Sequence, residues 1–179
     1  MTTVEQFLME AHNESGKYGG RLWVEVNGLS SLYILKISRV MHGTEEWTDN
    51  NINLHYCGYV GIPKSNPLYK KMSNFGGNAY DADDNILEGI YAHGGITFTG
   101  WMKKWGKDYF FVGFDCAHVT DSCSVADLKK DTMINGATFK SWDYTKVEVY
   151  GLYEQLSKVE SKSFVSDMMK KENNYYEKL

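Results

Sequence analysis

The chain has 179 residues, of which 42% are hydrophobic and 23% charged, a composition typical of one globular domain. Its net charge of -4 argues against the broad basic surface that binds duplex nucleic acid, and its three cysteines follow no familiar disulfide spacing. No apolar run reaches the roughly 18 residues of a membrane span, and no secretory signal is recognisable, so we expect a cytoplasmic protein.

The N-terminal part of the chain predicts a helix followed by a hairpin. A cap at Thr2 or Thr3 precedes apolar residues at helical spacing, and this helix should end between Asn13 and Gly16. RLWVEV and SLYILKI alternate in polarity on either side of Asn27-Gly28, a turn signal of β-hairpins.

A further strand and a long connection follow. LHYCGYVGI predicts a strand that ends at Pro63. Residues 63–89 contain both prolines, paired glycines and an acidic run, which indicates a long loop of the kind that often binds ligands.

The C-terminal part predicts two helices. A short one runs from Ser124 to Lys130, and Ser141 or Asp143 caps a last long helix. One face of this last helix carries Val149, Leu152, Tyr153 and Leu156. Residues 161–179 are a charged tail or a short helix, so residues 1–160 form a single α+β domain in which the terminal helices cover a mainly antiparallel sheet.

GGITFTGW and DYFFVGFDC predict a second strand pair around the loop WMKKWGK. With a symmetric turn, Gly100 faces Tyr109 and His93 faces Cys116. A slip of two residues changes these partners but leaves both ends of the pair together. We therefore expect one polar site there, formed by His93, Asp115, Cys116, His118 and Asp121.

Three chemical interpretations of this site remain open. The histidines and aspartates bind a divalent metal, or the histidines act as acid and base with an aspartate orienting one of them, or the site only binds a polar ligand. The candidate catalytic residues are His93, Asp115, His118 and Asp121, and the candidate ligand-binding residues are Tyr59, Gly94, Gly95, Thr97 and Cys116. The alternative is that these are ordinary packed residues at strand ends, since their spacing matches no strong metal signature.

The segments HYCGYVGIPKSNPLY, HGGITFTG, FVGFDCAHVTD and VEVYGLYEQL resemble a family of small, mostly uncharacterised phage and prophage proteins. That family has the motifs CGYVx(I/V)P, HGG(I/L)T and GFDCAHxxD in this order. The resemblance implies a phage accessory protein in the bacterial host cytoplasm, and such proteins often counteract host defence by hydrolysing or sequestering nucleotide-derived signals. It assigns no role to any single residue.

We therefore expect a protein that engages a nucleotide-derived small molecule, such as a cyclic nucleotide or an ADP-ribose-type signal, with hydrolysis slightly favoured. One alternative is a non-catalytic sponge that sequesters the signal, and another is an inhibitor that binds a host protein. The sequence leaves the need for a divalent metal and the formation of a homo-oligomer open.

Overall fold

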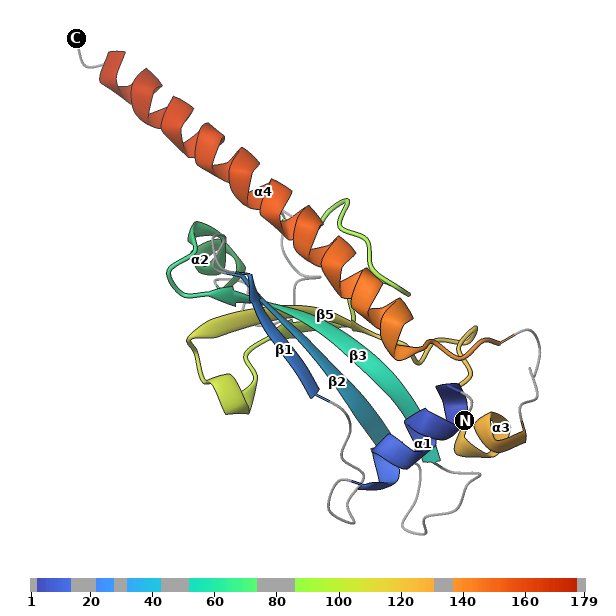
Figure 1. The fold of residues 1–179 in the computed structure, drawn as a ribbon. Coiled ribbons are helices and arrows are strands. Elements are labelled where there is room, and N and C mark those ends of the chain that lie inside the picture. The colour runs from blue at the N-terminus through green and yellow to red at the C-terminus, as the bar shows by residue number, and fades with distance from the viewer. Residues whose placement is uncertain are drawn as a thin grey trace.

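The computed structural model of the protein describes residues 3–13, 22–27, 32–42, 52–73, 86–130 and 137–176. The strands are β1 (Leu22–Asn27), β2 (Leu32–His42), β3 (Ile52–Pro63), β4 (Phe98–Gly100) and β5 (Tyr109–Asp115). The helices are α1 (Thr3–Asn13), α2 (Pro67–Ser73), α3 (Val125–Lys130) and α4 (Trp142–Tyr176), with a 3-10 turn η1 (Lys103–Trp105). All strands belong to one antiparallel sheet in the order β1-β2-β3-β5-β4 (Figure 1). The predicted α+β class is therefore confirmed.

The elements of the N-terminal part agree with their sequence patterns. Helix α1 begins at Thr3 and ends at Asn13, the first residue of the predicted range for its end. The predicted β1–β2 hairpin is present, but Asn27, predicted as a turn residue, is the last residue of β1 and pairs with Leu32. Residues 28–31, with the rest of the predicted turn, lie outside the described part of the chain.

The connection after β3 is not a loop throughout, because it contains α2. Its Pro67 stands at the first helical position, where the missing N–H has no helical partner to lose. The Asn66 side chain accepts a hydrogen bond from the Leu68 N–H (2.8 Å), and Leu68 and Met72 are buried one helical turn apart. The prediction of a loop over residues 67–73 is therefore wrong, and residues 74–85 lie outside the described part.

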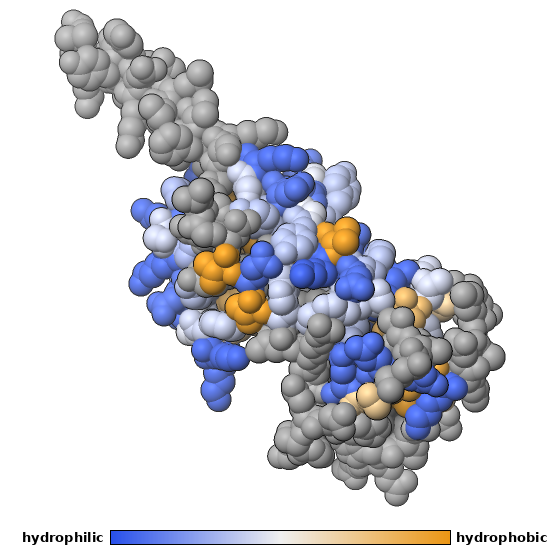
Figure 2. Space-filling view, viewed as in Figure 1, coloured by the Kyte–Doolittle hydropathy of each residue, from blue (hydrophilic) through white to orange (hydrophobic). Residues whose placement is uncertain are grey.

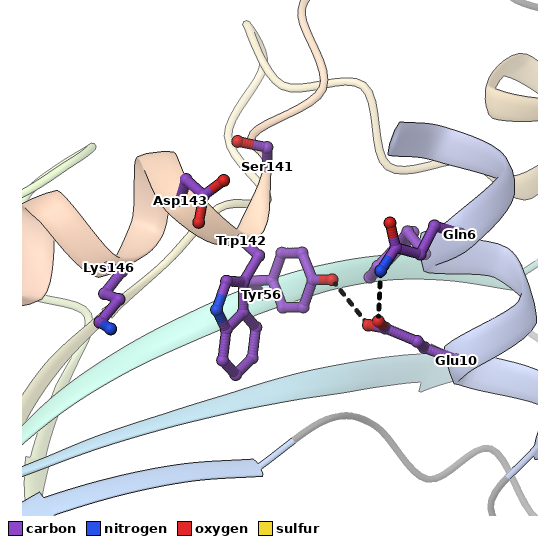
Figure 3. Close-up of a pocket in the computed structure, with 8 residues that line it drawn as sticks. Gln6, Glu10, Tyr56, Ser141, Trp142, Asp143 and Lys146 are labelled. Atoms are coloured by element: carbon purple, nitrogen blue, oxygen red, sulfur yellow. Dashed lines mark hydrogen bonds between the residues drawn. The ribbon is translucent and has the colours of Figure 1, made fainter. Parts of the chain in front are cut away.

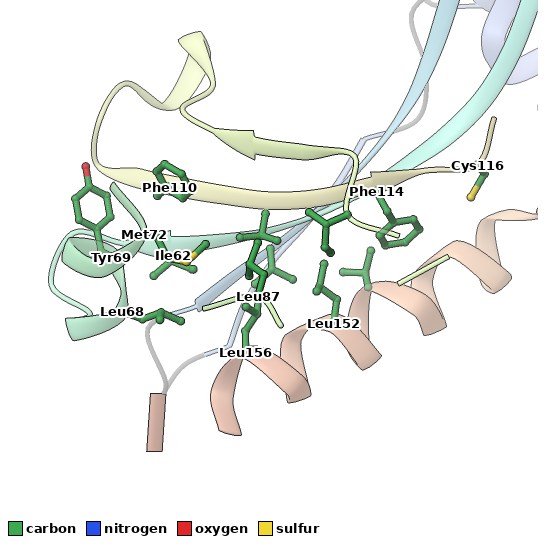
Figure 4. Packing of buried hydrophobic residues seen from close by; sticks show 14 residues of the cluster. Ile62, Leu68, Tyr69, Met72, Leu87, Phe110, Phe114, Cys116, Leu152 and Leu156 are labelled. Atoms are coloured by element: carbon green, nitrogen blue, oxygen red, sulfur yellow. The ribbon is translucent and has the colours of Figure 1, made fainter. Parts of the chain in front are cut away.

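The main core lies between the sheet and α4, which crosses one face of the sheet and extends beyond it (Figure 1). Val149, Leu152 and Leu156 of α4 are completely buried. They pack against alternate residues of β3 and β5, among them Val60 and Phe114 (Figure 4). Apolar residues thus recur every second residue in the strands and about every 3.6 residues in the helix. These repeats form the two apolar faces that pack together, as the sequence predicts.

Two smaller apolar clusters are present among the described residues. One joins α1 and α3 to the start of β3 around Phe7, Leu54 and Tyr56. The other contains Tyr59 and Phe111, which alternate with the residues under α4 and therefore occupy the opposite face of the sheet.

Helix α4 begins at a serine cap and is longer than predicted. The Ser141 hydroxyl accepts a hydrogen bond from the Tyr144 N–H (3.2 Å), so Ser141 and not Asp143 is the cap. Asp143 lies in the first turn, where a negative charge favours the helix dipole. Residues 161–176 continue the same helix and form no separate element.

The β4–β5 hairpin has a different register from the predicted one. Gly100 pairs with Phe111, two residues away from Tyr109. The predicted register assumed a symmetric loop between the two strands. The actual loop contains η1 followed by Gly106 with φ of +59°, so the chain turns back closer to β5 than a symmetric loop would. Strand β4 is also shorter than GGITFTGW, since its first residues form a turn.

Gly58 of β3 lies directly under α4. A Cβ at this position would lie 2.4 Å from Val149 Cγ2 and 2.6 Å from the Phe114 ring. We expect Gly58→Ala to lower the free energy of unfolding by about 1–3 kcal/mol, measured by urea denaturation, because this contact has no room for a methyl group. The matched control is Gly151→Ala in α4, where a Cβ meets nothing within 4 Å. It should raise the free energy by up to about 1 kcal/mol, and equal stabilities of the two variants would contradict this packing.

Candidate functional site

His93 lies in a tight turn just before β4. The turn closes through a hydrogen bond of 2.9 Å from the Gly95 N–H to the carbonyl three residues earlier. Gly94 and Gly95 have φ of +65° and +97°, in the region that only glycine adopts easily. The Thr97 N–H then donates to the Gly113 carbonyl of β5 (2.9 Å), which fixes the turn against the sheet.

The other half of the site follows β5, where the chain leaves the sheet. The Asp115 side chain accepts a hydrogen bond from the Ala117 N–H (3.1 Å). The Asp121 N–H donates to the His118 carbonyl (2.8 Å), and Asp121 forms an isolated parallel bridge with Thr138. These bonds hold the aspartates and the histidine at one corner of the sheet.

Asp121 connects the two turns. Its Oδ2 lies 2.7 Å from His93 Nε2 and accepts a second hydrogen bond from the His118 backbone N–H (2.9 Å). The Asp121 side chain is fully buried and that of His93 is 11% exposed. The two imidazole rings lie 5.4 Å apart between centroids. The predicted proximity is therefore confirmed for these three residues, which we call the histidine centre.

The close approach of His118 explains the glycine that follows His93. A Cβ at Gly94 would lie 1.8 Å from His118 Nε2, so any side chain there would displace the imidazole. Asp115 lies at the rim, with its Oδ1 3.9 Å from His118 Nε2 and its side chain 30% exposed. Asp115 is thus a neighbour of the histidine centre and makes no hydrogen bond to it.

The start of α4 and the segment just before it each contribute one residue that the sequence analysis missed. The Tyr144 hydroxyl lies 2.9 Å from His93 Nδ1, so both ring nitrogens of His93 are engaged. Burial, followed by the charge of Glu148, raises the pKa of Tyr144, which therefore keeps its proton at neutral pH. Lys140 brings its Nζ to 3.7 Å from Asp121 Oδ1 and to 5.3 Å from the Tyr144 ring centroid.

Gln155 holds the segment before His93 against the same side of α4. Its side chain accepts a hydrogen bond from the Tyr91 N–H (2.8 Å) and donates one to the Tyr91 carbonyl (2.7 Å). Tyr144 and Gln155 are about three helical turns apart and therefore lie on one side of the helix. Tyr144 lies outside the apolar face of this helix, so the helical pattern of the sequence carried no signal for it.

Cys116 is not part of the histidine centre. It is 2% exposed and belongs to the main core, where its Sγ lies 3.6 Å from Thr145 Oγ1. Burial is the main cause that raises the pKa of its thiol to about 12. A neutral, buried thiol does not act as a nucleophile and does not contact a ligand. The position of Cys116 therefore does not support its predicted ligand-binding role.

Two other predicted ligand-binding residues also lie apart from the centre. Tyr59 is 7% exposed on the opposite face of the sheet, with its ring edge-on to Phe98 at 5.5 Å between centroids. Thr97 is exposed, and its N–H donates a hydrogen bond to the Gly113 carbonyl of β5. Tyr59 belongs to β3 and not to the predicted hairpin, and strand alternation directs its side chain to the face of the sheet opposite α4.

A cavity of about 370 Å³ lies between α1 and the start of α4 (Figure 3). Its wall includes Trp142, Asp143 and Lys146 from α4. Gln6 and Glu10 of α1 face them, joined by a hydrogen bond of 3.2 Å from the amide to the carboxylate. The histidines are not among its lining residues, so this cavity is separate from the histidine centre although both involve the first turn of α4.

The described surface offers no broad apolar face on the side shown in Figure 2. It is mostly hydrophilic, and its hydrophobic residues form separate small groups. The exposed apolar side chains of the described part include Val24 and Val26, which are neighbours on one face of β1. A small exposed group of this kind is normal on a protein surface. Among the described helices, none has the length and apolar character needed to cross a bilayer.

Comparisons with known proteins give no lead to the function. No protein family, curated protein or solved structure matches the chain.

Proposed function

We propose that the protein engages a phosphorylated, nucleotide-derived small molecule and hydrolyses a phosphate ester or anhydride bond in it at the histidine centre. The observation that carries this proposal is the 2.7 Å contact between His93 Nε2 and the buried carboxylate of Asp121. An aspartate in this position orients an imidazole and stabilises the positive charge that develops on it during proton transfer.

The hydrogen bonds assign a role to each nitrogen of His93. A carboxylate only accepts, so Nε2 carries the proton shared with Asp121, and Nδ1 accepts the hydrogen bond of the Tyr144 hydroxyl. Tyr144 is 38% exposed, so its hydroxyl marks a position that solvent and a ligand reach. Once the Tyr144 hydroxyl is displaced, a water molecule in its place would give its proton to Nδ1 as the water oxygen forms a bond to phosphorus.

The second imidazole supplies the complementary step. His118 lies beside His93 and its side chain is 29% exposed. As the bond from phosphorus to the leaving oxygen breaks, a protonated His118 would give its proton to that oxygen. The proton that His93 then holds would pass through solvent to His118 and restore the starting state. Lys140, next to Asp121, adds a positive charge for the phosphate.

The biological setting of the proposal rests on the resemblance to small phage proteins. It supports an accessory, anti-defence role in the cytoplasm of a bacterial host, where nucleotide-derived signals of immunity are the substrates. Cyclic nucleotides contain a phosphate ester bond and ADP-ribose-type signals a phosphate anhydride bond, and the proposed chemistry cleaves bonds of both kinds.

Incubation with a panel of cyclic and ADP-ribose-type nucleotides tests the proposal. After the protein is denatured, chromatography measures how much of each nucleotide remains and which products appear. We expect catalytic loss of at least one nucleotide, with products that differ from it by one water. Depletion that denaturation reverses would show sequestration instead, and an unchanged panel with no binding would contradict both versions.

A further inference from the structure

Two buried polar atoms at the histidine centre have no hydrogen-bond partner among the residues that the structure describes. They are His118 Nε2 and Asp121 Oδ1. The nearest charged groups that the structure gives them are Asp115 Oδ1 at 3.9 Å and Lys140 Nζ at 3.7 Å, both beyond hydrogen-bond distance. Buried polar atoms are nearly always satisfied, so two such atoms in one place indicate a bound ion or ligand.

The residues around these atoms have the composition and spacing of a metal site. One ring nitrogen from each of His93 and His118 and one carboxylate oxygen of Asp121 all lie within 4.8 Å of one another. Bonds of about 2 Å in a tetrahedral arrangement place ligand atoms roughly 3.3 Å apart, so small side-chain rotations are enough to bring them to one ion. Two imidazoles with a carboxylate favour zinc and its neighbours over magnesium and calcium, which prefer oxygen.

The surroundings also suit a metal. The hydroxyl of Tyr144 lies against His93 Nδ1, and a hydroxyl accepts from an N–H as readily as it donates to a bare nitrogen. It therefore fits the tautomer that a metal on Nε2 would require, in which Nδ1 carries the proton. The backbone N–H of His118 fixes the Asp121 carboxylate in the same way.

We propose that His93, His118 and Asp121 bind one divalent transition-metal ion, with at least one coordination position open to water or to a phosphate oxygen. The ion takes the place of the proton between His93 Nε2 and Asp121. This inference deepens the proposed hydrolysis and rests on it for its chemical role, since a water on such an ion is acidic enough to attack phosphorus near neutral pH. In this state a water on the ion would be the nucleophile, and His93 and His118 would act as ligands in place of their roles as base and acid.

Metal titrations of the metal-free protein test this inference independently of turnover. Visible absorption measures the binding of Co²⁺, and calorimetry measures the binding of Zn²⁺. The affinity tag is removed first, and chelator is removed by dialysis. We expect one equivalent per chain in the wild-type protein and an affinity at least ten-fold lower in His118→Gln and Asp121→Asn. The matched control is Asp143→Asn, an exposed carboxylate in the first turn of α4, which should bind as the wild type does.

The outcomes separate this inference from the proposed function. Absence of stoichiometric binding, or affinity unchanged in both His118→Gln and Asp121→Asn, overturns the metal site. Hydrolysis that continues in excess chelator also overturns it and leaves the proposed function standing. Stoichiometric binding by these three residues without turnover of any nucleotide in the panel supports the metal site and overturns the hydrolase. Circular dichroism confirms that each variant is folded.

Discussion

Replacing His93 with glutamine should lower the turnover of the susceptible nucleotide by about 10²- to 10⁴-fold, the range that a positioned acid–base group contributes. His93 contacts both Asp121 and Tyr144, so its loss removes the base in the metal-free mechanism and a ligand in the metal-bound one. The measurement is the initial rate of product formation at saturating nucleotide.

The matched control for His93→Gln is Tyr91→Ala. Tyr91 lies two residues earlier on the same segment, its side chain is 77% exposed, and Gln155 holds it by the backbone only. This variant should keep nearly full activity. If His93→Gln is folded and retains wild-type turnover, the histidine centre is not where the chemistry occurs.

Asp121→Ala should lower the free energy of unfolding by about 3 kcal/mol, because it removes two hydrogen bonds to a buried carboxylate and leaves the His118 N–H without its acceptor. Asp121→Asn keeps one acceptor oxygen and should cost roughly half as much. Urea denaturation of the metal-free protein measures both values. A stability of Asp121→Ala within about 0.5 kcal/mol of the wild type would show that this carboxylate does not hold the two turns together.

The sequence was most informative where one local pattern decides the structure. The period of the apolar residues predicted α1, the face of α4 and the hairpin of β1 and β2, and all three are present. The hairpin argument also placed His93 beside His118 and Asp121, because the end of a strand pair is insensitive to a small shift in register. The catalytic roles of these residues remain predictions.

The errors arose where tertiary contacts or turn geometry decide. The glycines after His93 were included in a strand, but their positive φ values make a turn, and η1 moved the strand register by two residues. Pro67 was taken as part of a loop, although it starts α2. Tyr144 and Lys140 lie about 50 residues from His93 in the sequence, and only the packing of α4 across the sheet brings them to it.

The most direct test of the central claim is a titration of the ¹³Cε1–¹H signals of the histidines with the nucleotide that the panel identifies. His55, which is 3% exposed and lies on β3, is an internal reference. We predict saturable shifts of the His93 and His118 signals at one nucleotide per chain, with the His55 signal unchanged. Saturating binding that leaves the signals of His93 and His118 in place would contradict the account and would direct attention to the cavity between α1 and α4.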